Sequence, residues 1–332
     1  MIKKDSNPAQ QVREAFYRHP YSWNDLLPFV GVLAAYLLAG DYLALGSQVI
    51  IMIVFALSLD LVLGYGGIPT LGHAALFGMG AYAAGLFAKH VSGEPLMGFA
   101  VACGAGALTA LLTGPIVLRS RGITLVMLTL AVSTMLLELA NSWQALTGGA
   151  DGLYGLQIAP LLGRFEFDLW GHVAYWYSAG VMAAAFVLCK IVVNSPFGLI
   201  VRGMRENPAR MRLLGVPVTK YLVLLYGISG LVAGAAGGLT AQVTQLVGLD
   251  AFSFVLSGNV LIMLILGGTG SLYGAIVGAT VFVILADRAA SVSPFHWLFA
   301  LGIVLIVTVR YAPDGLVGVL SSRRFSFLYK KH

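Results

Sequence analysis

Three ionisable side chains lie in long apolar segments of the 332-residue sequence, where they could contact a polar solute: His73, Asp60 and Glu138. An ionisable group at membrane depth is costly, and it tends to face a cavity or a partner group. The two acids could therefore form the polar wall of a conduit or a proton relay. Each acid is also consistent with a structural hydrogen bond between helices, because two isolated acids do not make a relay.

His73 belongs to the glycine-rich segment LGYGGIPTLGHAALFGMGAYAAG, residues 63–85. Its first glycines and its proline are expected to break a helix near 64–72, and Thr70 is the expected N-cap of the following helix. Broken backbone is tolerated at membrane depth only where it is buried in protein or lines a water-filled path. A restarting helix offers N–H groups and a positive dipole end to an anionic or polar solute. The alternative is a tight turn in which His73 bonds a backbone carbonyl.

The elements that position these residues follow from the composition, which is 58% hydrophobic and only 10% charged. A soluble domain carries about 25% charged residues. We therefore expect an all-α, polytopic transmembrane helical bundle, because the apolar segments are too long and continuous for a β-barrel. About ten spans are predicted, at residues 26–46, 47–64, 68–88, 95–118, 122–142, 170–193, 221–246, 252–268, 271–289 and 296–311.

Basic residues predict the orientation of the bundle. Sixteen of the 20 Lys and Arg residues fall in segments 1–25, 119–121, 194–220 and 310–332. Since Lys and Arg collect in cytoplasmic loops, both termini are predicted to be cytoplasmic. The 64–72 break then lies near the cytoplasmic end, as a turn or a gate would. The expected parts are a cytoplasmic N-terminal segment (1–25), a transmembrane domain (26–311) and a basic cytoplasmic tail (312–332).

Motifs for several chemistries are absent from the sequence. There is no G-x-x-x-x-G-K-[ST], and the loop-like GGTGSLYGA at 267–275 lacks the lysine that binds phosphates. No H-E-x-x-H or C-x-x-C occurs, so no metal site is expected. The spans hold no cluster of ionisable residues, so we expect no enzyme chemistry on the solute.

Glycines also recur at the four-residue spacing that lets helices approach closely in lipid, at Gly270, Gly274 and Gly278 and again at Gly230 and Gly234. The glycine-rich elements at 64–85 and 267–279 could mark an inverted pair of repeats.

The longest predicted cytoplasmic connection, 194–220, carries five basic residues. Its stretch ENPARMRLLG could form a short helix along the membrane, closed by Gly215. The helix could dock a cytoplasmic partner. Alternatively, the connection is an ordinary basic loop that touches lipid headgroups, and charge alone does not separate the two interpretations.

Several segments, in order, resemble permease subunits of the branched-chain amino acid ABC importers, of the LivM type. The resemblance covers about residues 45–318. It rests on LGYGGIPTLGHAALFGMGAYAAGL, RSRGITLVMLTLA, LTGGADGLYGL, SPFGLIVRGMRENPARMRLLGVPVTKYLVLLYGISGLVAGAAGGL, LIMLILGGTGSLYGAIVGA and RYAPDGLVG.

The resemblance implies a multi-pass protein of the bacterial inner membrane that works by alternating access. Its expected partners are a second homologous permease, two ATP-binding subunits and a periplasmic solute-binding protein, in a lipid membrane. This chain would bind no cofactor, because ATP and Mg belong to the ATPase subunits. The implied ATPase-coupling residues are Glu206, Asn207, Pro208, Ala209, Arg210, Leu214 and Gly215. The implied pathway residues are Thr70, Gly72, His73 and Phe77, with Asp60 and Glu138 as candidate pathway acids.

One departure concerns the solute. The family usually has Ser before its LGH sequence, whereas this chain has Thr70 preceded by Pro69, which keeps the hydroxyl and stiffens the backbone. The expected solute is a branched-chain amino acid or a related small polar or carboxylate solute. Alternatives are urea, amides or aromatic carboxylates. A rival of another class is an ion-coupled secondary carrier or channel, for which Asp60 and Glu138 are the only candidate ion site.

Overall fold

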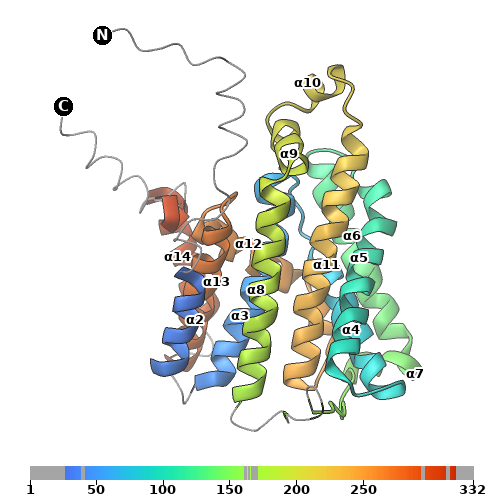
Figure 1. The fold of residues 1–332 in the computed structure, drawn as a ribbon, viewed down its shortest axis with the longest axis vertical. Coiled ribbons are helices and arrows are strands. Elements are labelled where there is room, and N and C mark those ends of the chain that lie inside the picture. The colour runs from blue at the N-terminus through green and yellow to red at the C-terminus, as the bar shows by residue number, and fades with distance from the viewer. Residues whose placement is uncertain are drawn as a thin grey trace, which may run out of the picture.

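Helices that run mostly along the long axis of the molecule form a bundle (Figure 1). The computed structural model describes residues 27–38, 42–160, 163, 165, 171–292, 296–311 and 315–318. The predicted N-terminal segment 1–25 lies outside the described residues, and the predicted tail 312–332 is described only at 315–318. The cytoplasmic location of both termini therefore stays a prediction.

The described residues form helices and the connections between them, which confirms the all-α class. The helices are α2 (Leu27–Leu38), α3 (Leu43–Leu59), α4 (Ala74–His90), α5 (Pro95–Val117), α6 (Ile123–Ser142), α7 (Gln144–Thr147), α8 (His172–Asn194), α9 (Pro196–Glu206), α10 (Pro208–Leu213), α11 (Val218–Thr244), α12 (Phe254–Gly267), α13 (Leu272–Val292) and α14 (Trp297–Tyr311). A π-helical turn (Asp60–Tyr65) extends α3, and short 3-10 turns lie at Gly149–Asp151 and Leu249–Phe252.

Six helices are long and apolar enough to cross a membrane: α3 with its π turn, α5, α6, α8, α11 and α13. A helix needs about 20 apolar residues to cross the hydrocarbon core. The helices α2, α4, α12 and α14 have 12, 17, 14 and 15 residues and lie at the other positions where spans were predicted. A multi-pass helical bundle is thus established, while the count of about ten spans stays a prediction.

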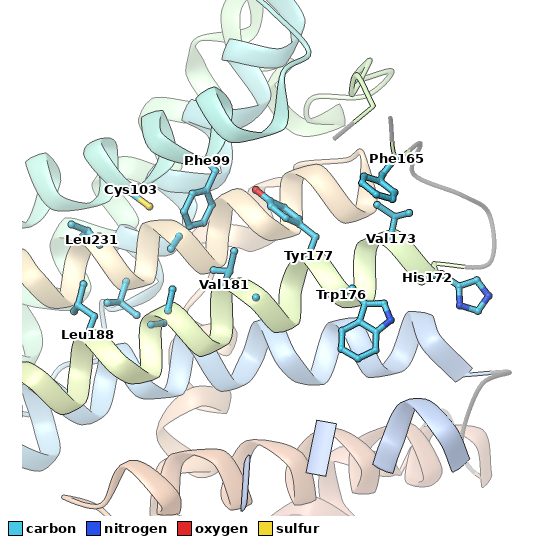
Figure 2. A pocket seen from close by; sticks show the side chains of 15 residues that line it. Phe99, Cys103, Phe165, His172, Val173, Trp176, Tyr177, Val181, Leu188 and Leu231 are labelled. Carbon is cyan, nitrogen blue, oxygen red and sulfur yellow. The ribbon is translucent and has the colours of Figure 1, made fainter. Parts of the chain in front are cut away.

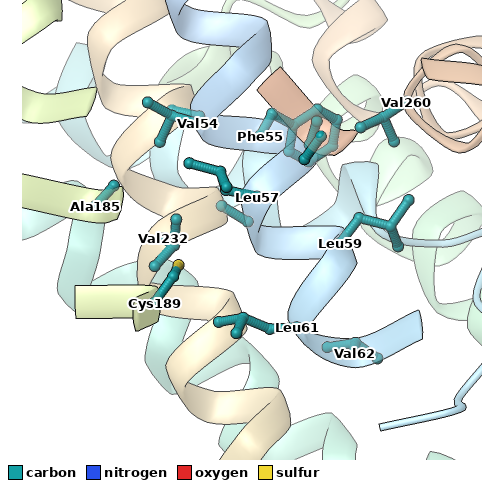
Figure 3. Close-up of a cluster of buried hydrophobic side chains, with 14 of the residues drawn as sticks. Val54, Phe55, Leu57, Leu59, Leu61, Val62, Ala185, Cys189, Val232 and Val260 are labelled. Atoms are coloured by element: carbon teal, nitrogen blue, oxygen red, sulfur yellow. The ribbon is translucent and has the colours of Figure 1, made fainter. Parts of the chain in front are cut away.

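Helix α3 lies at the centre of the bundle because its sequence is apolar on every face. Its residues from 53 to 57 are buried, and Val54, Phe55 and Leu57 have no exposed surface. Figure 3 shows these side chains among residues of α8, α11 and α12. A helix enclosed in this way can carry polar groups and broken backbone at its end without exposing them to lipid.

Glycines bring α11 against α5, as their four-residue spacing predicts. A methyl group on Gly230 would collide with the Gly106 carbonyl of α5 at 2.5 Å, and one on Gly234 would meet the Ala102 carbonyl. A methyl group on Gly237 would meet the Phe77 carbonyl of α4. Since backbone touches backbone at these points, α4, α5 and α11 form a closely packed unit.

The connection between α8 and α11 folds into two short helices rather than one. Ser195 caps α9 by accepting the Gly198 N–H at 3.3 Å, and Asn207 caps α10 by accepting the Arg210 N–H at 2.9 Å. The single helix predicted from Glu206 onward is wrong at its start, because the residue before Pro208 is disfavoured in helical conformation. Asn207 is extended, with φ −151° and ψ 92°. Both helices lie at one end of the bundle, opposite α7 (Figure 1).

Candidate functional site

The predicted interruption lies between α3 and α4. Helical structure stops after Tyr65 and resumes at Ala74, which confirms a break near 64–72. The π turn closes with the Gly66 and Ile68 N–H groups donating to the carbonyls of Leu61 and Val62, both at 3.0 Å. These hydrogen bonds span five and six residues instead of four, and they end α3 without a regular cap. π turns of this kind occur frequently at functional sites.

The expected N-cap role of Thr70 is wrong, because α4 begins four residues later, at Ala74. The Thr70 hydroxyl accepts the Gly72 N–H at 3.3 Å, which forms a local turn rather than a helix start. The Leu71 N–H donates to the Thr129 hydroxyl of α6, and Gly72 lies so close to the Thr129 carbonyl that a methyl group would collide with it. Contact with α6 therefore keeps this stretch out of the helix.

The first N–H groups of α4 are already occupied. The Ala74 N–H donates to the Ser257 hydroxyl of α12 at 2.9 Å, and the next two donate to the carbonyls of Gly72 and His73, both at 3.1 Å. The start of α4 thus does not present the free donors that a restarting helix was expected to offer a solute. A distant serine does the capping instead.

His73 ties the break to the centre of the bundle. Its Nε2 lies 2.8 Å from the Ser58 hydroxyl, which itself donates to the Phe55 carbonyl at 2.6 Å. Because the Ser58 proton is used there, the His73 Nε2–H must be the donor. The imidazole stacks on the Phe55 ring with centroids 5.4 Å apart, and only 1% of His73 is exposed. The side chain therefore links the break to α3 through a hydroxyl, rather than through the backbone carbonyl of the alternative prediction.

The predicted pathway residues lie together but in packed surroundings. Thr70, His73 and Phe77 are buried, and Phe77 packs on Phe55 with ring centroids 4.8 Å apart. A cavity of about 740 Å³ lies elsewhere, between α5, α8 and α11 (Figure 2). A second cavity of about 730 Å³ lies between α2, α3 and α13. Neither cavity is lined by a predicted pathway residue.

The two acids occupy different environments and are not brought together. Asp60 is fully buried, and its Oδ1 accepts the Gly270 N–H at 2.7 Å. Its other carboxylate oxygen has no hydrogen-bond partner within the described residues. Glu138 lies on the exposed side of α6, five residues before Trp143. An ion site that uses both acids has no support in this arrangement.

Residues from the connection between α8 and α11 reach the break. The Arg205 guanidinium of α9 donates from Nη1 to the Gly64 carbonyl at the end of α3. Sequence reasoning missed Arg205, because nothing in its spacing indicates a contact 141 residues away. Beyond it, the predicted coupling residues Glu206, Asn207, Ala209, Arg210, Leu214 and Gly215 are exposed, and Pro208 is partly buried.

An interrupted helix buried in a multi-pass bundle, linked to an exposed polar connection, is the architecture of a membrane transport subunit. Residues 42–309 match the protein family described as "Branched-chain amino acid transport system / permease component". The chain belongs to this family, as the resemblance predicted.

Three relatives show the range of the similarity. The high-affinity branched-chain amino acid transport system permease protein LivM of Salmonella typhimurium is 28% identical over 300 residues, covering 82% of this chain and 69% of the relative. A probable branched-chain amino acid transport permease protein, LivH, of Methanocaldococcus jannaschii is 23% identical, with 81% and 89% covered. The ribose import permease protein RbsC of Escherichia coli K12 is 26% identical, with 79% and 82% covered. No solved structure matches the chain.

Proposed function

We propose that this chain is one of two permease subunits of an ATP-driven importer in the bacterial inner membrane. The solute is a branched-chain amino acid or a related small polar or carboxylate molecule. The family supports the transporter class, and the relative named for ribose supports a wider range of small polar solutes. The observation that carries the proposal is the direct contact between the exposed α9–α10 segment and the interrupted helix.

The α9–α10 segment is the proposed docking site for the ATPase subunits. Its apolar tip is strongly exposed, with Leu213 at 90% and Leu214 at 70%, and basic residues flank it. An exposed apolar tip with flanking charge is suited to insertion into a groove of a partner protein. The docking residues of this proposal are Glu206, Asn207, Pro208, Ala209, Arg210, Leu214 and Gly215.

The interruption between α3 and α4 is the proposed adjustable wall of the pathway. Thr70, Gly72, His73 and Phe77 shape this wall by holding the non-helical stretch against α3 and α6. Solute contact by these residues would require the wall to open, since they are buried in the present conformation. Alternating access supplies such an opening when the ATPases close and pull on α10.

The partners provide the first test of the proposal. The tagged full chain is purified from its native membranes in mild detergent, and every co-purifying protein is identified with its stoichiometry. We expect a second, related permease, paired ATP-binding subunits and an associated solute-binding protein. A homo-oligomer that moves solute in ATP-free liposomes would overturn the proposal in favour of a self-sufficient carrier.

A pair of variants separates ATP-driven transport from ion-coupled transport. The double variant Glu206→Ala with Arg210→Ala should abolish uptake, because both side chains lie on the exposed docking segment. Asp60→Asn should be much milder, because an amide oxygen can still accept the Gly270 N–H. Uptake of radiolabelled solute into cells measures both variants. The reverse order of severity would favour the ion-coupled carrier.

A further inference from the structure

The end of α3 presents a backbone acceptor toward α9. The last carbonyls of a helix lack partners within the helix and carry partial negative charge, so they favour a cation. The N–H groups of residues 66–68 satisfy the carbonyls of Leu61, Leu63 and Val62. The Gly64 carbonyl receives the Arg205 guanidinium instead. Arg205 thus completes the helix end with a charge-assisted hydrogen bond.

The glycines at this point leave room for no other side chain. A methyl group on Gly64 would collide with Asp60 Oδ1 and would lie 2.5 Å from the Gly270 nitrogen. Gly67, with a φ of +67°, lies under the Arg205 side chain, where a methyl group would lie 2.8 Å from Cγ. The sequence GYGG therefore ends the helix, and its glycines leave the space that the Arg205 side chain occupies.

The second glycine-rich interruption meets the first at the same point. Asp60 Oδ1 accepts the Gly270 N–H from the loop between α12 and α13. A methyl group on Gly270 would lie 3.1 Å from Arg205 Nη1, so the guanidinium passes beside both interruptions. One cation from α9 thus bonds the first interruption and lies beside the second.

Arg205 stands two residues before Asn207, where α9 meets α10. We propose that Arg205 is the positioning residue that transmits movement of the α9–α10 segment to the interrupted helices. It acts through a junction formed with Asp60, Gly64 and Gly270. This inference rests on the proposed function, because it takes α10 as the part that the ATPases move. When α9 moves, Arg205 leaves or follows the end of α3, and the first interruption changes shape against the loop before α13.

Arg202, one turn earlier on α9, is a natural control for Arg205. Its Nη2 donates to the Val193 carbonyl at the end of α8 at 3.0 Å, and its guanidinium lies over the Tyr65 ring at 5.3 Å. Arg202 therefore anchors the base of α9 with the same charge, and it reaches the end of α3 only through the Tyr65 ring, without a hydrogen bond to a carbonyl there. Loss of Arg202 tests general anchoring, whereas loss of Arg205 tests the junction.

The experiment uses the complete complex, with its ATPases and binding protein, in liposomes. Solute uptake and ATP hydrolysis are measured together for wild type, Arg205→Gln, Arg205→Lys and Arg202→Gln. We expect Arg205→Gln to assemble and hydrolyse ATP while the solute moved per ATP falls about tenfold or more, as loss of a charged contact of some 1.4 kcal/mol or more would give. Arg205→Lys should recover part of this ratio, and Arg202→Gln should keep it.

Variants of Asp60, the acidic residue of the junction, provide a second test. Asp60→Ala removes the acceptor for Gly270 and should lower the uptake per ATP as Arg205→Gln does. Asp60→Asn keeps an acceptor oxygen and should stay near wild type. Complex yield and melting temperature are recorded for each variant. If Arg205→Gln lowers yield or melting temperature but the assembled complex keeps the wild-type uptake per ATP, its role is only structural and the inference is overturned.

The remaining outcomes are also decisive. Equal uncoupling by Arg202→Gln would assign the effect to general anchoring of α9 and overturn the role of Arg205. If too little Arg205→Gln complex assembles, the uptake per ATP of Asp60→Ala is measured instead, and a wild-type value overturns the inference. A wild-type complex that takes up solute without ATP defeats the proposed function itself. A wild-type complex that is ATP-driven, with an unchanged ratio in the variants, defeats only the junction.

Discussion

The helical bundle is interrupted before α4 and again before α13, and the two interruptions are held together by different kinds of contact. The first, residues 66–73, is fixed by side chains from three helices, among them Ser58, Thr129 and Ser257. The second, residues 268–271, is enclosed mainly by close backbone contact. Methyl groups on Gly267 and Gly278 would collide with carbonyls of the facing helix.

The difference bears on which interruption can move. Side-chain hydrogen bonds can exchange by rotation about single bonds, so most of the first interruption can change shape while its helices stay in place. Among its glycines, only Gly72 packs against the backbone of another helix, at Thr129 of α6. Backbone contact between α12 and α13 changes only if the helices separate, because no side chain intervenes. We infer that the α12–α13 hairpin is the fixed support and that the stretch before α4 is the adjustable element.

The largest effect is expected from a change that attacks the backbone contact. In Gly278→Ala, the methyl group would meet the Met263 carbonyl and lie 2.7 Å from the Gly267 nitrogen. The helices must separate, at a cost of about 3 kcal/mol or more, the upper end for overpacking, because backbone rather than a flexible side chain has to give way. Detergent-solubilised protein is heated to a series of temperatures and analysed by size-exclusion chromatography. The heating midpoint, at which half of the monodisperse peak is lost, should be lower than in the wild type.

Gly258→Ala is the matched control for this change, because Gly258 lies on α12 with no atom within 4 Å of the new methyl group. It should leave the heating midpoint almost unchanged. Equal midpoints for the two variants would show that the α12–α13 contact is not rigid, and the comparison between the interruptions would fail.

A smaller and more informative effect is expected at His73. His73→Ala removes the bond to Ser58 and the stacking on Phe55, and it should cost about 1–3 kcal/mol because the buried hydroxyl loses a donor. His73→Gln should recover part of this loss, since an amide can still donate to Ser58. Heating midpoints and the KM for uptake are measured together.

The two measurements separate the structural role of His73 from solute binding. If His73 only holds the interruption, the midpoint falls and KM changes little in both variants. A KM that rises while the midpoint stays unchanged would instead place His73 in contact with the solute.

The location of the first interruption could be predicted from the sequence, but the contacts that hold it could not. Glycine and proline act locally, so the break near 64–72 could be predicted from these residue types alone. Its true helix start could not, because Ser257, which caps Ala74, lies 183 residues away in the chain. The Arg205 contact has the same origin, since packing of α9 against α3 creates it. The resemblance supplied the family, while the geometry showed that Asp60 is buried against the Gly270 N–H and that Glu138 is exposed on α6.

The smallest effect is expected from Ser257→Ala, which removes the hydroxyl that caps α4. Loss of a helix cap typically costs about 1 kcal/mol, and the Ala74 N–H would be left buried. Ser257→Thr keeps the hydroxyl and serves as the control. Both are compared by heating midpoint with His73→Ala. A larger loss from Ser257→Ala than from His73→Ala would mean that the start of α4 is held chiefly by α12, the fixed support. In that case the stretch before α4 could not move independently of α12, and the adjustable wall would have to be sought on the α3 side, at the Arg205 junction.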